Sequence, residues 1–402
     1  MKTRHFPSRL LRKAGRGFSL IELLVSTAVL SMLLIMVFQM LKGMQTTWKR
    51  TRQDVGEFKD ARQAFEEITR RVSSATLNTY FSYRYDDQLV NGATIRMGRE
   101  IIPQSELHFV CGPADELGIA QKNSSQVGQR YTHAIFFQAP FGFCINENKN
   151  KADQLQYERM NGLMNAWGYY IEFNTDELDR PQMLNQLDNS PKPRPRYRLM
   201  EFRQPTEYFQ IYKLHLRDMD KNASREKIYE WFTEGKYSVN SEWNTSLKDR
   251  DSEGFFRTTR VVSENIIAMI LHPREADEKR ESSTDELAPD YHFDSRRFQW
   301  SGSSDEALQT RHQLPPVIDI TFIAVDETSF NKFAVQEQIR SAEDDPKLVD
   351  KDLFKRARDF RKDLKTVEER LTQKKLDFRI FNTSLRIRES KWTDDSEEEP
   401  KP

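Results

Sequence analysis

The sequence is poor in the residues that build metal and redox sites. Its 402 residues hold two cysteines and seven histidines, which never stand in a CxxC, HExxH or HxH spacing. The 15 glycines form no phosphate-binding GxxxxGK[ST] motif, and no Ser/His/Asp arrangement can be recognised along the chain. These absences argue against zinc, thiol-redox and nucleotide chemistry. We therefore expect no enzyme, no cofactor and no metal site.

An excess of charge of either sign is also missing, although the charges are unevenly distributed. Lysines and arginines together number 62, as do aspartates and glutamates. Residues 1–17 hold six of the basic residues and no acid, which leaves 56 basic against 62 acidic residues in the rest of the chain. Proteins that bind nucleic acid usually present a basic face. We expect no nucleic-acid partner for this weakly acidic remainder.

Long hydrophobic runs are absent too, with one exception at residues 18–41. This run, FSLIELLVSTAVLSMLLIMVFQML, is interrupted only by Glu22, Gln39 and small hydroxyl side chains. As a helix it would be about 36 Å long, enough to cross a bilayer core of about 30 Å. Because the basic flank lies on its N-terminal side, we expect residues 1–17 in the cytoplasm and the body in the periplasm. The chain would cross the inner membrane once.

Three interpretations of this segment differ in where the chain is cut. A secretory signal has a shorter apolar region followed by a small-x-small site, whereas here the chain continues QMLKGMQTTWKR. An uncleaved signal anchor fits the length and the charge but leaves Glu22 unexplained, and it would tether a binding or enzymatic domain outside the cytoplasm. The third interpretation places the cut before the apolar run, between Gly17 and Phe18.

The stretch GFSLIELLVS after a basic leader resembles the class III signal of type IV pilins and pseudopilins. The resemblance implies that a prepilin peptidase cuts after Gly17 and that the new N-terminus at Phe18 is methylated. It implies that Glu22, the fifth residue of the mature chain, serves assembly. The implied partners are the lipid bilayer, an inner-membrane assembly machinery and other pilin or pseudopilin subunits, which pack through their N-terminal helices into a cell-envelope filament.

Elementary electrostatics offers a reason for Glu22 that does not depend on the resemblance. A cut before Phe18 leaves an α-amino group four residues before the Glu22 carboxylate. Inside a bilayer, a cation paired with Glu22 of a neighbouring subunit costs much less than either charge alone. The alternative is a glutamate near the interface whose carboxylate stays in water.

Residues 42–76 are expected to continue the same helix as an amphipathic half. No proline occurs between residues 18 and 76, so one helix of about 58 residues could run from the membrane into the body. Gly43 and Gly56 are the expected bend points. Seven apolar residues recur at helical spacing and predict a face packed on the core: Val55, Phe58, Ala61, Phe65, Ile68, Val72 and Ala75.

Residues 77–393 are expected to form a β-rich extracytoplasmic domain, followed by an acidic disordered tail at 394–402. The Pro-rich residues 188–198 predict an extended crossing loop, and residues 347–375 predict a long surface helix. The expected fold class is α+β, a long N-terminal helix packed on an antiparallel, pilin-like sheet with long loops. β-branched and aromatic residues predict strands over 105–112, 133–145, 168–173, 208–214, 255–273, 317–327 and 378–390.

A few polar residues of this domain are candidates for sites. His108 and His133 lie in apolar segments and are expected to be hydrogen-bonded sheet residues. The acidic residues 285–294 lack the DxDxDG pattern of a calcium loop and are expected to be a solvated loop. Outside the cytoplasm Cys111 and Cys144 could form a disulfide worth roughly 3–4 kcal/mol, or remain two free thiols.

The C-terminal third carries a second resemblance. The succession VVSENIIAMILHP, QLPPVIDITFIAVDE and FRIFNTSLRIRES resembles the order seen in J-type minor pseudopilins and PilW-like minor pilins. Over nearly its full length the chain is similar to the Verru_Chthon cassette protein C group of prepilin-type proteins. The resemblance implies a minor subunit of a type II secretion or type IV pilus-like filament, with no reaction catalysed by this chain.

Overall fold

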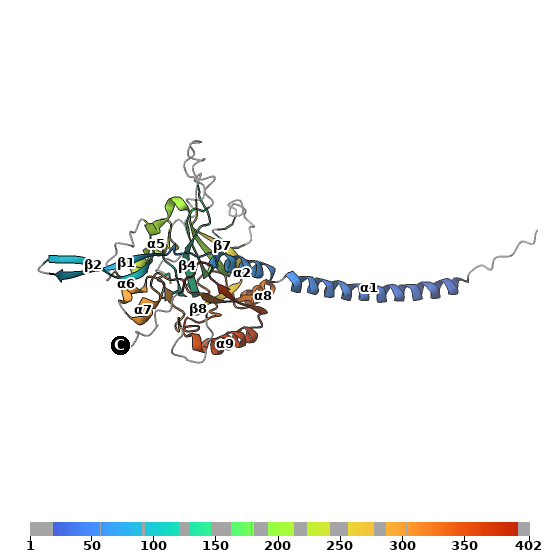
Figure 1. Cartoon of the computed structure of the whole chain (residues 1–402). Coiled ribbons are helices and arrows are strands. Elements are labelled where there is room, and N and C mark those ends of the chain that lie inside the picture. The colour runs from blue at the N-terminus through green and yellow to red at the C-terminus, as the bar shows by residue number, and fades with distance from the viewer. Residues whose placement is uncertain are drawn as a thin grey trace, which may run out of the picture. The chain divides into compact units, whose positions relative to one another are not determined.

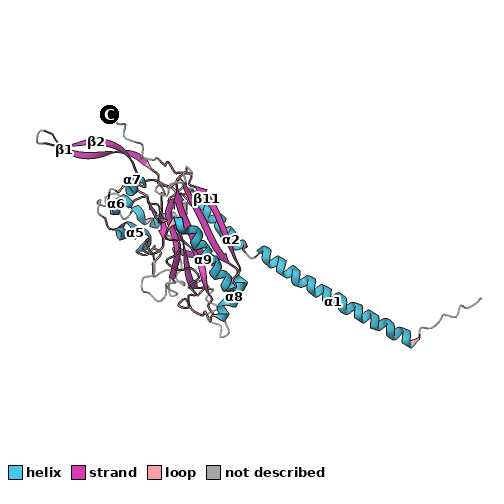
Figure 2. Ribbon diagram, turned by 90° about the horizontal axis from the view of Figure 1, so that it is seen from below, coloured by secondary structure: helices cyan, strands magenta, loops and turns pink. Residues whose placement is uncertain are grey.

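The computed structural model of the protein describes residues 19–56, 58–90, 93–119, 129–145, 162–177, 179–180, 192–212, 223–241, 256–276, 287–302 and 304–392. The chain divides into two compact units, residues 1–57 and residues 58–402 (Figure 1). The first unit contains helix α1, Leu20–Gly56. In the second unit (Figure 2) the helices are α2 (Lys59–Val72), α5 (Arg225–Thr233), α6 (Arg297–Ser301), α7 (Asp305–Gln309), α8 (Glu327–Gln336) and α9 (Phe360–Gln373).

The strands of the second unit form three antiparallel sheets. A six-stranded sheet has the order β7-β6-β5-β4-β3-β9, a three-stranded sheet has the order β11-β10-β8, and β1 and β2 pair as a hairpin. The fold class is therefore α+β, as the sequence predicted. The strands are β1 (Tyr80–Val90), β2 (Ala93–Gln104), β3 (Val110–Pro113), β4 (Gln129–Ala139), β5 (Asn165–Thr175), β6 (Pro195–Gln204), β7 (Thr259–Glu264), β8 (Ile266–Arg274), β9 (Phe293–Asp294), β10 (Val317–Val325) and β11 (Phe378–Arg386).

The single helix expected over residues 18–76 is wrong in one respect, because the structure has two helices in its place. α1 ends at Gly56, one of the two expected bend points, and α2 begins at Lys59. Phe58, which precedes α2, has φ −115° and ψ 19°, outside the helical range. Glycine costs about 1 kcal/mol in a helix interior, so the break falls where the helix is weakest. Gly43 lies inside α1, which continues past it.

α2 buries the apolar face that the sequence predicted. Ala61, Ile68 and Val72 are buried in the core. Phe65 lies edge-on to Phe322 of β10, with ring centroids 5.1 Å apart, and 5.8 Å from Phe381 of β11. α2 therefore packs on the three-stranded sheet, and burial of this face anchors it to the body.

A break in β4 connects the two large sheets. The register between β4 and β5 shifts between Tyr131 and Ile135, and Thr132 has φ 53°. The hydroxyl of Thr132 accepts a hydrogen bond from the Met269 N–H of β8 (3.1 Å). The next residue, His133, accepts from the Leu271 N–H of β8 (2.9 Å). The extra twist of a bulge thus turns polar groups of β4 toward the second sheet.

Several elements differ from those predicted. Residues 195–204 form strand β6, although the Pro-rich stretch suggested a loop, and residues 206–212 contain two 3₁₀ turns (Thr206–Tyr208 and Gln210–Tyr212) in place of a strand. The long strand expected at 255–273 is two strands, β7 and β8, separated by Asn265 with φ 61°. The helix expected over 347–375 is shorter, since α9 begins at Phe360 after a 3₁₀ turn, Ala357–Asp359.

Hairpin β1–β2 is the largest element that the sequence did not predict. Figures 1 and 2 both show it extending from the rest of the second unit. Phe81, Tyr83 and Ile101 on it are 56–64% exposed. Such exposed aromatic and β-branched residues stabilise cross-strand pairs, and the pairing Tyr83↔Ile101 is one of them.

Gly168 in the centre of β5 is expected to tolerate no side chain. A Cβ there would collide with the ring of Phe136 and come within 2.8 Å of the Ile135 carbonyl oxygen. We expect Gly168→Ala to lower the free energy of unfolding by about 3 kcal/mol, measured by urea titration of tryptophan fluorescence. Gly162→Ala is the matched control, because no atom lies within 4 Å of its Cβ position. An unchanged midpoint for Gly168→Ala would contradict this close packing.

Candidate functional site

The proposed processing segment meets the described structure at Ser19. Gly17 and Phe18, the residues expected to flank the cut and carry the methyl group, lie outside the described residues. The Ser19 carbonyl accepts hydrogen bonds from the N–H groups of Glu22 (2.9 Å) and Leu23 (3.1 Å), which closes the first turn of α1. Glu22 therefore lies in the first turn, where a carboxylate interacts favourably with the positive end of the helix dipole.

Between Glu22 and Phe38 α1 carries only apolar and small hydroxyl side chains. Residues Leu20–Lys42 form a stretch of 23 residues that is long and apolar enough to cross a membrane, and none of it is buried within its unit. The hydroxyls of Ser26, Thr27 and Ser31 donate to the carbonyls three residues earlier, at 2.9–3.0 Å. The small polar side chains are thus satisfied inside the helix, which is the condition for placing them in a bilayer.

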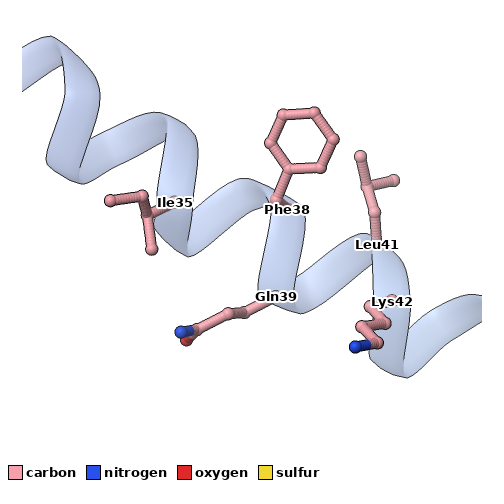
Figure 3. A pocket seen from close by; sticks show the side chains of 5 residues that line it. All are labelled: Ile35, Phe38, Gln39, Leu41 and Lys42. Atoms are coloured by element: carbon pink, nitrogen blue, oxygen red, sulfur yellow. The ribbon is translucent and has the colours of Figure 1, made fainter.

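A shallow depression near the end of this stretch is an open surface. Figure 3 shows Phe38 and Leu41 projecting from one side of α1, and Gln39 and Lys42 from another. The depression is lined only by these residues and Ile35, all from one helix. Side chains that diverge from a single helix cannot enclose a ligand, so we assign no binding site here. Lys42 marks the end of the apolar stretch.

Comparison with known protein families decides what kind of segment this is. Residues 12–38 match the prokaryotic N-terminal methylation motif. The motif is prepilin-type, and it implies processing by a prepilin peptidase and pilus-like assembly. No curated protein and no solved structure matched the chain. The match spans Gly17, Phe18 and Glu22 but ends at residue 38, so the finer resemblance of the C-terminal third to J-type pseudopilins stays a prediction.

The sequence did not reveal the polar cluster around Asp294 in the body. The Asp294 side chain is fully buried and accepts four hydrogen bonds. The donors are His108 Nε2 (2.7 Å), the Arg296 N–H (2.7 Å), the Tyr229 hydroxyl (3.0 Å) and Trp300 Nε1 (2.8 Å). Burial alone would raise the pKa of Asp294, but the hydrogen bonds donated by His108 and Trp300 hold it below the usual range.

His108 is held in one neutral tautomer by this cluster. Trp231 Nε1 donates to His108 Nδ1 (3.0 Å), so Nε2 carries the proton that is donated to Asp294. Burial lowers the pKa of His108, and nearby Arg296 lowers it further. With both ring nitrogens engaged, the imidazole has no free position for acid–base catalysis. The cluster therefore connects α5, which carries Tyr229 and Trp231, to β9.

His133 is likewise hydrogen-bonded within the fold. Its Nδ1 accepts from the Leu271 N–H, and its Nε2 lies 2.9 Å from the Phe354 carbonyl. The prediction that His108 and His133 are hydrogen-bonded is confirmed, but only His133 is a sheet residue, because His108 lies two residues before β3.

The solvated loop predicted for the acidic residues 285–294 is wrong where the structure describes it. From Leu287 onward most of these residues are buried, and Tyr291, His292 and Phe293 are 0–2% exposed. The acidic residues suggested exposure to solvent, but Asp294 accepts four hydrogen bonds inside the body. Among the described residues, no group of three histidines, cysteines or carboxylates is arranged to hold a metal ion.

Cys111 and Cys144 are both free thiols in the structure, so the pairing that the sequence left open is not formed. Cys111 is fully buried in β3, where it lies opposite Ile135 of β4. The residue before Cys144 donates its backbone N–H to the Asn165 side chain, and Asn165 lies opposite Ala139 of β4. Ile135 and Ala139 are four residues apart on β4, about 13 Å, which exceeds the roughly 7 Å that a disulfide spans between Cα atoms. Burial raises the pKa of the Cys111 thiol, which keeps it protonated.

Proposed function

We propose that this chain is a minor pilin or pseudopilin subunit, cleaved after Gly17, methylated on Phe18 and assembled through its N-terminal helix into a filament of the type II secretion or type IV pilus kind. The observation that carries the proposal is the methylation motif over residues 12–38, joined to an apolar stretch that its own unit leaves entirely exposed. A helix that presents apolar side chains on all sides must be covered by lipid or by other helices.

The role of Glu22 follows from its position in this proposal. It is the one charged residue between Phe18 and Leu41. A charge at this depth is costly unless it is paired. Cleavage before Phe18 would supply the partner, an α-amino group on the mature N-terminus of a neighbouring subunit. We place the chain in the inner membrane with its body in the periplasm before assembly.

We also propose that the body acts by binding and not by catalysis. The buried imidazoles of His108 and His133 have both ring nitrogens engaged, as described above. This arrangement supports a structural role for them.

The experiment that tests the proposal is intact mass and N-terminal sequencing of the chain extracted from its native membrane. We expect a mature start at methylated Phe18. Gly17→Asp is expected to abolish processing, because the peptidase requires the small residue before the cut, and the chain should then keep residues 1–17. Gly43→Asp, outside the motif, is the control and should be processed normally.

A start at residue 1 in the wild-type chain would refute the proposal. The chain would then be a signal-anchored binding or enzymatic domain, and Glu22 would be a tolerated glutamate at the membrane interface.

A further inference from the structure

Three arginines surround one buried carboxylate at the junction of α2 with β5, β6 and β7. Arg71 comes from the last turn of α2, Arg203 from β6 and Arg260 from β7, and the carboxylate is Glu201 of β6. The strand register places Arg260 opposite Glu201 and Arg203 opposite Trp167 of β5. We call these three arginines and Glu201 the Arg203 cluster.

Glu201 is already saturated by its donors. Its Oε1 accepts from Arg71 Nη1 (2.7 Å), Trp167 Nε1 (2.8 Å) and the Tyr169 hydroxyl (3.0 Å). Its Oε2 accepts from Arg260 Nε. The carboxylate is 1% exposed. It is therefore paired with Arg71 and Arg260, and Arg203 makes no ion pair with it in the described part of the chain.

Arg203 is the arginine left without a carboxylate. Its guanidinium lies between two aromatic rings, 4.9 Å from the centroid of Phe143 and 5.2 Å from that of Phe256. Its Nε is buried with no hydrogen-bond partner, and in the described part of the chain no carboxylate oxygen lies within ion-pair distance of it. Burial lowers the pKa of Arg203, and repulsion from Arg260 and Arg71 lowers it further, against the attraction of Glu201.

The charges next to the cluster do not neutralise it. Glu67 of α2, which also pairs with Arg71, accepts from Arg70 (2.6 Å) and from Arg71 (2.6 Å). Arg260 is 48% exposed, so solvent and solutes reach the cluster. An uncompensated, half-buried guanidinium at an accessible surface gains from any anion that arrives, because the anion removes both the desolvation cost and the repulsion.

We propose that the Arg203 cluster binds a carboxylate of an acidic peptide segment on a partner protein. The guanidinium plane presents paired N–H groups that match the two oxygens of a carboxylate. The rings of Phe143 and Phe256 hold that plane in position, so little side-chain entropy is lost on binding.

A nucleic-acid strand fits the same surface less well. Proteins that bind single strands offer free aromatic faces on which bases stack. Here the faces of Phe143, Phe256 and Trp167 are turned toward guanidinium groups, the last of them 4.6 Å from Arg71.

The site goes beyond the proposed filament function and is independent of it. All its residues belong to the unit 58–402, whereas processing and helix assembly depend on residues 12–41. A chain that is not cleaved after Gly17 would therefore not contradict this binding site. A chain that does not bind the acidic peptide would not contradict the proposed cleavage and assembly.

The test is fluorescence anisotropy of fluorescein-labelled hexaglutamate with the full-length chain in detergent at low ionic strength. We expect saturable binding to the wild type and a loss of affinity of roughly tenfold or more in Arg203→Gln, the effect of one charge-assisted bidentate pair. Arg311→Gln is the matched control, because Arg311 also lies over a ring, 4.8 Å from the Phe298 centroid, outside the cluster. Its affinity should equal that of the wild type.

Two further readouts separate binding from structure. Because Arg203 is repelled by its neighbours, Arg203→Gln should melt at the wild-type temperature or above it, and a lower melting temperature would overturn the proposal by showing a structural role. Arg203→Lys, which keeps the charge but loses the planar fork, should also bind more weakly and guards against a folding defect. Absence of wild-type binding would overturn the proposal. The proposal would also be overturned if inorganic phosphate or oligothymidylate displaced the labelled peptide as strongly as unlabelled hexaglutamate does.

Discussion

Lowering the pH from about 7.5 to about 5 is expected to reduce the free energy of unfolding of the body by at least about 4 kcal/mol. The cause is a set of four histidines that are 0–4% exposed: His108, His133, His292 and His312. Burial lowers the pKa of all four, to about 4 for His133 and His292. In the unfolded chain each would titrate near its usual value of about 6.5.

The sign follows from proton counting. Between about pH 4 and pH 6.5 these histidines bind protons in the unfolded chain but not in the folded chain. Their contribution to the free energy of unfolding is therefore fully present above the unfolded pKa of about 6.5 and is lost as the pH falls below it. At pH 5 the protonation of His133 and of His292 in the unfolded chain has each lowered the free energy of unfolding by about 2 kcal/mol. His108 and His312 act in the same direction. For a domain stabilised by about 5–15 kcal/mol this is a large fraction.

Carboxylates modify this profile in other ways. The lowered pKa of Asp294 adds stability that is lost only below about pH 4, where its unfolded counterpart would protonate. Burial raises the pKa values of Glu116 and Asp345, so these two gain relative stability as the pH falls. Both are only partly buried, and solvent weakens their effect relative to the four histidines.

Urea titrations at a series of pH values, followed by tryptophan fluorescence, measure this dependence. His133→Gln should reduce the number of protons taken up on unfolding near pH 5 by about one, which makes the free energy of unfolding less dependent on pH. Glutamine can offer an acceptor to the Leu271 N–H and a donor to the Phe354 carbonyl without titrating. A free energy of unfolding that stays level from pH 7.5 to 5 would contradict the assignment of these histidines as buried and neutral.

Replacing Glu22 by alanine is expected to leave the chain processed and inserted but to reduce its incorporation into filaments by roughly tenfold or more. This prediction rests on the proposed function. The variant removes the one charge between Phe18 and Leu41, so insertion becomes easier while the mature α-amino group of a neighbour loses its partner. The measurement is in vivo cross-linking between α1 helices, compared with the fraction of chain that remains in the inner membrane.

Ser31→Ala is the matched control for Glu22→Ala. Its hydroxyl donates to the Ala28 carbonyl of the same helix at 2.9 Å, so its removal leaves assembly contacts intact. Glu22→Gln keeps the shape and loses the charge, and it should fail as Glu22→Ala does. If Glu22→Gln assembled normally, hydrogen bonding or packing would suffice, and the charge-pairing account would be wrong.

The parts of the fold that could be predicted depend on residues close together in the chain. The apolar run of α1 is continuous and the buried stripe of α2 repeats every three or four residues, so neighbouring residues are enough to recognise both. Gly56 is predictable as a bend point because glycine has a low helix propensity. The strands β4, β5, β10 and β11 could be predicted because β-branched and aromatic residues are concentrated in each of them.

Strand β6 shows where local patterns mislead. The Pro-rich, basic residues 188–198 suggested an extended crossing loop, yet Arg196 and Arg198 are 1–2% exposed. Each has a carboxylate partner far away in the chain, Glu327 for Arg196 and Glu264 for Arg198. Burying an arginine is tolerated only when such a partner exists, and the partner cannot be read from the strand itself.

The sequence by itself determined that this protein has one membrane-capable helix with a prepilin-type motif, because that signal is written in contiguous residues 12–38. Only the tertiary structure decided which polar groups of the body are satisfied and which are not. Asp294 receives its proton donor from His108, 186 residues away, and Glu201 receives Arg71 from 130 residues away. Arg203 is left without a carboxylate for the same reason: Glu201, two residues away on β6, is paired with Arg71 of α2 and Arg260 of β7, and this convergence exists only in the folded chain.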